Sequence, residues 1–110
     1  MNEFIVILIT CASSEEAEKI TETLVSEKLI ACGNIVSGVQ SIFFWQGKIS
    51  KEKESLIIAK SVKKEFSSVV ARVKTLHSYT VPEIIALPLI EGSAEYLRWI
   101  EETLRKIQSV

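Results

Sequence analysis

The sequence has 110 residues, of which 47% are hydrophobic and 25% are charged, so it is long enough and apolar enough to fold around one core. Thirteen basic residues against fourteen acidic ones leave a formal net charge of -1, which provides no positive field to attract a nucleic acid. No apolar run reaches the roughly 18 residues that a membrane span needs. We therefore expect one soluble domain over residues 1–110, with neither nucleic acid nor membrane as a partner.

The start of the chain and its cysteines indicate a cytoplasmic protein. The first three residues carry no basic region, and the apolar run that follows them is too short for a signal peptide. Cys11 and Cys32 are too few for a disulfide framework and lack CxxC spacing. We expect both to remain thiols in a reducing cytosol, mainly as buried side chains.

A strand and a helix are predicted at the beginning of the chain. Residues 4–9 (FIVILI) are β-branched and apolar on both faces, which is typical of a central strand covered on both sides. Ser13 and Glu16 have the spacing of a capping box, and apolar residues recur after them at helical spacing. These patterns predict a helix over about residues 14–28.

A long hairpin follows. Residues 33–46 are rich in β-branched and aromatic side chains, and Gly38 within them indicates a bulge. Gln46 and Gly47 supply a turn, after which the return strand is polar over residues 48–55 and apolar over residues 56–59. Because the hairpin is longer than an average strand pair, we expect its aromatic tip to project beyond the domain.

The last third of the chain predicts helix, strand and helix. The second helix has one apolar stripe and is closed by His77; the stripe consists of Val62, Phe66, Val69, Val70, Val73 and Leu76. A strand over residues 83–87 precedes Pro88, which lacks an amide donor and so favours a sheet edge. The final helix starts near Ser93 and has an apolar face formed by Tyr96, Leu97, Ile100, Leu104 and Ile107.

This order, βαββαβ with an added C-terminal helix, predicts an α+β, ferredoxin-like sandwich. Right-handed crossovers place the strands over residues 4–9 and 56–59 in the middle and leave the other two at the edges. An edge as long and aromatic as residues 35–45 needs a partner, and a second copy of the chain can supply one. Head-to-tail pairing would have to close into a ring, such as three sheets forming a prism, while an isologous dimer fits the pattern equally well.

His77 is the only histidine, and two interpretations of it remain open. It can cap the second helix by donating to a backbone carbonyl, or it can ligate a metal. In the second interpretation its partners would be Glu83, Cys32 or carboxylates of another subunit. The metal candidates are therefore His77, Cys32 and Glu83.

Other candidate chemistry is weaker. Cys11 lies where ferredoxin-like metallochaperones place a pair of thiolates, but here there is one. The loop over residues 10–14 lacks the glycines and the arginine that a phosphate-cradling loop of an acylphosphatase-like enzyme needs. The paired carboxylates Glu15 with Glu16, Glu52 with Glu54 and Glu101 with Glu102 lie in polar surroundings and are interpreted as solvated faces. We expect no enzyme active site.

Several segments together resemble the CutA divalent-cation tolerance family along nearly the whole chain. They are EKLIACGNI at residues 27–35, SIFFWQGKI at residues 41–49, HSYTVPEIIALP at residues 77–88 and YLRW at residues 96–99. Ser78 stands where the family usually has proline, and Phe43 where it usually has tyrosine.

The resemblance implies a homotrimer, architecturally similar to the PII signalling proteins, in which the long hairpins interlock the subunits. It also implies tolerance to divalent cations, with copper or zinc held weakly at clefts between subunits by His77 and, less directly, Cys32 and Glu83. An alternative is a PII-like module that binds a small anionic ligand or a protein partner without metal, with Lys48, Lys60 and Tyr79 as contacts.

Overall fold

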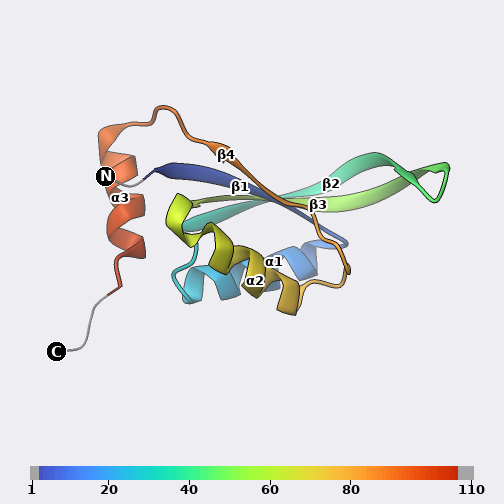
Figure 1. The fold of residues 1–110 in the computed structure, drawn as a ribbon, viewed down its shortest axis with the longest axis horizontal. Helices are drawn as coiled ribbons and strands as arrows, with labels where there is room; N and C mark the ends of the chain where they lie inside the picture. Colours follow the sequence, from blue (N-terminus) through green and yellow to red (C-terminus); the bar gives the residue numbers. More distant parts are fainter. Residues whose placement is uncertain (1–2, 107–110) are drawn as a thin grey trace.

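The structure, a computed structural model, describes residues 3–106 and has the predicted order of elements (Figure 1). A short 3₁₀ turn, η1, is added between the third strand and the second helix. The elements are β1 (Phe4–Cys11), α1 (Ser14–Ser26), β2 (Cys32–Trp45), β3 (Lys48–Val62), η1 (Lys63–Glu65), α2 (Phe66–Leu76), β4 (Ile84–Pro88) and α3 (Ala94–Leu104). Within residues 3–106, no helix is long and apolar enough to cross a membrane.

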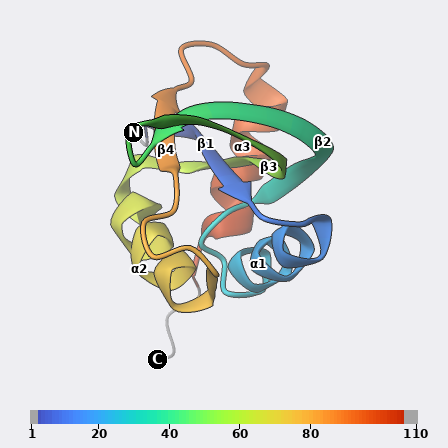
Figure 2. The ribbon, with the colours of Figure 1, turned by 90° about the vertical axis from the view of Figure 1, so that its right-hand side faces the viewer.

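The strands form an antiparallel sheet in the order β2-β3-β1-β4, so β1 and β3 are central and β2 and β4 are the edges, as predicted. The helices α1 and α2 lie beneath one face of this sheet, whereas α3 stands at the end that is far from the hairpin tip (Figures 1 and 2). This arrangement confirms the ferredoxin-like α+β fold.

Burial along β1 alternates strictly, which differs from the expectation of a strand covered on both sides. Ile5, Ile7, Ile9 and Cys11 are buried against α1 and α2, while the intervening residues are half-buried. Since successive side chains of a strand point to opposite faces, the helix-free face of β1 is apolar but incompletely covered. At its first residue, Phe4, this face contacts a second cluster that includes Val62 and α3.

The β2–β3 hairpin has the predicted turn and bulge. Gln46 and Gly47 both have positive φ, 49° and 76°, which is the pattern of a type I′ turn. At Gly38 φ is 70°, and the pairing register shifts between Val36 and Val39. The hairpin projects far beyond the helices (Figure 1), and its tip side chains are open to solvent.

Two predicted helix boundaries were wrong. The first helix ends at Ser26 rather than near residue 28, because Lys28 has a positive φ of 58°. Val62 does not belong to the second helix but is the last residue of β3, where it pairs with Phe4. The start of α3 was right, since Ser93 caps it with a hydrogen bond from the Tyr96 amide. Ile107, predicted on the apolar face of that helix, lies outside the described residues.

Candidate functional site

The loop between α2 and β4, residues 77–83, is held against the end of β1 by His77. The Tyr79 amide donates to His77 Nδ1 over 3.0 Å, so that nitrogen has no proton. His77 Nε2 lies 2.8 Å from the Thr10 carbonyl oxygen and must therefore be the protonated nitrogen that donates to it. The imidazole thus donates to a backbone carbonyl, but this carbonyl belongs to β1 and not to the second helix, so the side chain does not cap the helix that His77 follows.

Glu16 ties the same loop to α1. Its Oε2 accepts the Ser78 amide at 2.7 Å, and its Oε1 accepts the Ala12 amide at 3.0 Å. Burial by itself would raise the pKa of the Glu16 carboxyl, but the hydrogen bonds from Ser78 and Ala12 lower it below the ordinary value. One of the two hydrogen bonds of the capping box is present, because the Ser13 hydroxyl accepts the Glu16 amide. The Glu16 carboxylate accepts the Ala12 amide instead of the Ser13 amide.

Tyr79 connects the loop to the base of the hairpin. Its hydroxyl donates to Glu54 Oε2 over 2.7 Å, and its ring lies 4.8 Å from the imidazole of His77, centroid to centroid. Burial and the Glu54 carboxylate raise the pKa of Tyr79 above its ordinary value. The interpretation of Glu16 and Glu54 as solvated was wrong, since Glu54 is only 8% exposed and Glu16 is half-buried. Each carboxylate accepts a hydrogen bond from the loop over residues 77–83, which is distant in sequence.

Cys11, Glu16 and His77 form a cluster of potential metal ligands, with one donor atom of each lying within 4.8 Å of the others. A thiolate, a carboxylate and an imidazole are a donor set that suits zinc or copper. Burial raises the pKa of the Cys11 thiol to about 12, and the charges of Glu16 and Glu54 act in the same direction. A metal that used this cluster would displace the thiol proton and compete for an imidazole nitrogen with the hydrogen bond that the nitrogen already makes, to the Thr10 carbonyl or the Tyr79 amide.

The sequence interpretation discounted Cys11, because a metallochaperone-like site needs two thiolates, and it assigned Glu16 to a capping box and a solvated face. The order of the elements could have indicated this cluster. Cys11 ends β1, and Glu16 is in the first turn of the helix that follows. His77 directly follows α2, the crossover helix that leads back to the same end of the sheet. In a ferredoxin-like fold these three places converge.

The structure separates two of the predicted metal ligands. Cys32 faces Lys60 in the sheet, whereas Thr10, which His77 contacts, faces Leu56. The two positions are four residues apart on β3, about 13 Å at roughly 3.3 Å per residue. Glu83 is exposed and directly precedes β4, whose first residue pairs with Ile9, so it lies at the same end of the sheet as His77.

Cys32 has a neighbour of its own. Its Sγ lies 3.3 Å from the hydroxyl oxygen of Tyr96 on α3. This hydrogen bond and burial raise the pKa of Tyr96 to about 12. Within one subunit, Cys32 therefore contacts an aromatic side chain of α3 and not the proposed metal partners His77 and Glu83.

An exposed apolar surface, here called the open sheet face, covers the side of the sheet opposite α1 and α2. The pairing register places Val6 beside Leu87, and Leu8 between Ile58 and Ile85, all on the helix-free side. Ile85 and Leu87 are 48% and 50% exposed. The hairpin tip is apolar as well: Ile42, Phe44, Trp45 and Ile49 are between 61% and 75% exposed.

Comparison with known proteins identifies the family. The family described as CutA1 divalent ion tolerance protein matches residues 5–103, which is nearly the whole described chain. The chain belongs to the CutA1 family. The divalent-cation tolerance protein CutA of Thermus thermophilus is 50% identical over 97 residues, covering 88% of this chain and 94% of that relative.

Solved CutA1 structures share the fold closely. The crystal structure of CutA1 from Oryza sativa superposes with a TM-score of 0.92 at 36% identity, covering 96% of each chain. A structure described as the periplasmic divalent cation tolerance protein CutA of Archaeoglobus fulgidus has a TM-score of 0.90 at 43% identity and covers 93% of this chain and 99% of that one. The resemblance expected from the sequence is thus confirmed at the level of family and fold.

Proposed function

We propose that this chain is a non-enzymatic, cytoplasmic divalent-cation tolerance protein of one domain that acts as a homotrimer and binds copper or zinc weakly where its subunits meet. The observation that carries the proposal is the open sheet face. Its apolar side chains come from each of the strands, yet α1 and α2 cover only the other side of the sheet.

Contact between copies of the chain would cover this surface. An exposed apolar patch of this extent on an isolated subunit indicates an interaction surface. Within residues 3–106, the outer edges of β2 and β4 pair with no further strand, so their backbone groups are open for pairing with another copy. Pairing of one subunit's hairpin with the next subunit is head to tail, and a closed ring of three copies satisfies every such edge without forming a fibre.

The metal site of this proposal is shared between subunits. His77 is the central candidate, and Glu83 lies at the same end of the sheet. Cys32 is about 13 Å away along the sheet of its own subunit, so it can join His77 only from a neighbouring copy. Cys11 and Glu16 are alternative donors within the subunit. When bound, the metal would tie adjacent subunits together through imidazole, carboxylate and thiolate ligands.

Calorimetric titration of the purified protein with Cu(II) and with Zn(II) tests this function, with His77→Ala as the variant. Glu18→Ala, which removes an exposed carboxylate elsewhere on α1, is the matched control. We expect saturable binding that weakens at least about tenfold in His77→Ala and is unchanged in Glu18→Ala. Absence of saturable binding, or equal binding by all three proteins, would contradict the metal-binding part of the proposal.

A second candidate function, binding of a small ligand without metal, is favoured by a cavity of about 380 Å³ beside the open edge of β2. It lies between α1 and the start of β2 and is lined by Thr21, Glu22, Val25, Ser26, Ala31, Cys32 and Gly33. Among the residues that the structure describes, the buried Thr21 Oγ1 has no hydrogen-bond partner. A metabolite screen that returns a reproducible ligand, together with no metal binding, would favour this function over the first.

A further inference from the structure

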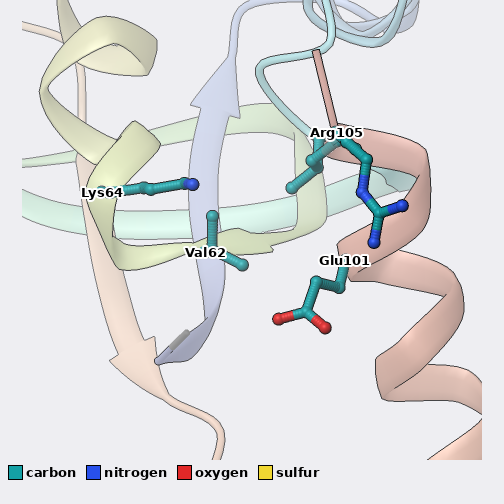
Figure 3. A pocket seen from close by; sticks show the side chains of 5 residues that line it. Val62, Lys64, Glu101 and Arg105 are labelled. Atoms are coloured by element: carbon teal, nitrogen blue, oxygen red, sulfur yellow. The ribbon is translucent and has the colours of Figure 1, made fainter. Parts of the chain in front are cut away.

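A second cavity, of about 260 Å³, lies at the end of the sheet that is far from the hairpin tip, where the end of β3 and η1 face α3. Figure 3 shows Lys64, Glu101 and Arg105 around it, with Val62 between them. Val62 and Leu104 form its apolar lining and are 1% and 5% exposed. The site therefore combines a buried apolar base with charged groups at its rim.

The basic residues around this cavity differ in their partners. Lys63 pairs with Glu3 at 3.3 Å, and Lys106 pairs with Glu65 at 3.1 Å. In the stretch from residue 3 to residue 106, the side chains of Lys64 and Arg105 form no ion pair. Two cations from separate elements thus converge on one cavity with their charge available to a ligand.

We propose that this cavity binds a small organic monoanion, a carboxylate on a short aliphatic chain. The planar guanidinium of Arg105 matches a carboxylate in a bidentate manner, and the ammonium of Lys64 adds a second positive charge. The aliphatic part would lie on Val62 and Leu104. A cavity of 260 Å³ is just below the range of about 300–1,000 Å³ for ordinary small-molecule sites, which favours a short ligand.

Glu101 influences which ligand charge the cavity prefers. Its carboxylate lines the same cavity, and it takes part in an interaction of its own. A carboxylate beside the ligand repels a second negative charge, which favours a monoanion over a dianion such as hydrogen phosphate. The preference for a monocarboxylate therefore follows from Lys64, Arg105 and Glu101 together.

This site is independent of the metal proposal. Val62 pairs with Phe4 at the start of β1, whereas the cluster of Cys11, Glu16 and His77 lies at its end. The seven residue steps between Phe4 and Cys11 span about 23 Å at roughly 3.3 Å per residue. None of the metal candidates lines the cavity at α3, although Cys32 contacts α3 through Tyr96, so either proposal can fail without the other.

NMR titration of the full-length protein with acetate, propionate, butyrate and inorganic phosphate tests the inference. We expect chemical-shift changes at the amides of η1 and the end of α3, and an affinity that rises about fourfold with each added CH₂ group until the cavity is full. Phosphate should bind more weakly than butyrate at a pH where it is a dianion. Lys64→Gln and Arg105→Gln should each weaken butyrate binding about tenfold or more.

Lys63→Gln is the matched control, because it removes a neighbouring exposed lysine that is already paired with Glu3. Arg105→Lys keeps the charge but loses the planar fork, and should fall between the native protein and Arg105→Gln. Each substituted side chain is exposed, so the variants are expected to fold. Equal affinity for acetate and butyrate, equal weakening by Lys63→Gln, or absence of saturable shifts at η1 and α3 would overturn the inference.

Discussion

Tyr79→Phe removes a single oxygen atom and tests whether the loop that carries His77 is anchored to the hairpin. In the native protein the Tyr79 hydroxyl donates to a carboxylate oxygen of Glu54 over 2.7 Å, and Glu54 is 8% exposed. A hydrogen bond to a charged group contributes about 1.5–3 kcal/mol, and removing its donor leaves the carboxylate under-satisfied. Because Tyr79 is itself only half-buried, we expect the lower part of this range, about 1.5–2 kcal/mol.

Urea unfolding at a fixed protein concentration measures this loss, because the stability of an oligomer depends on concentration. With a slope of about 2 kcal/mol per molar urea, the unfolding midpoint should fall by about 1 M. Tyr96→Phe is the control, since over residues 3–106 its hydroxyl has one hydrogen-bond partner, the weakly polar Cys32 thiol, and its side chain is 42% exposed. The control should cost less than about 0.5 kcal/mol. Equal midpoints for the two variants would refute the anchoring role of Tyr79.

Further predictions concern charge, backbone conformation and thiol chemistry. The pKa of Glu16 is lowered in the folded state, so its contribution to stability is present above its unfolded pKa of about 4.3 and is lost as the pH falls through the folded value. Glu16→Gln should therefore be less stable than the native protein at neutral pH, as measured by urea unfolding. A stability difference between the two proteins that stays constant down to about pH 2 would contradict this. Gly47→Ala should cost about 1–2 kcal/mol from backbone strain alone, because φ is 76° and, apart from the adjacent residues, no atom lies within 4 Å of the added methyl group. The unfolding midpoint measures this cost, and an unchanged midpoint would exclude the strain. Cys11 should react with a chromogenic disulfide reagent only after unfolding, because its thiol is buried and has a pKa of about 12. Rapid reaction at neutral pH in the folded protein would contradict this burial.

The strands and the hairpin turn were predictable from sequence where a few adjacent residues determine the local structure. The run at residues 4–9 identified a central strand, Gln46 and Gly47 identified the hairpin turn, and Pro88 identified an edge strand, all as found. Val62 shows the limit of periodicity. Its spacing continues the helical stripe to Phe66, but pairing with Phe4 and packing against Ile100 and Leu104 hold it in β3.

The candidate site was less predictable because it depends on contacts between segments far apart in the chain. Glu16 and Glu54 look like solvated carboxylates in their local sequence, yet each accepts a hydrogen bond from residues 78–79, more than twenty positions away. His77 and Cys32 were grouped by the chemistry of their donor atoms, and the pairing register places them apart within one subunit. Only the folded topology brings Cys11 to His77.

Assembly is the point on which the shared metal site depends, and sedimentation equilibrium at micromolar concentration measures it most directly. The apolar open sheet face and the unpaired strand edges predict a species of about three times the subunit mass of 12.3 kDa. A well-folded species that sediments at 12.3 kDa would contradict the account, because each surface that we assign to a neighbouring copy would then face water.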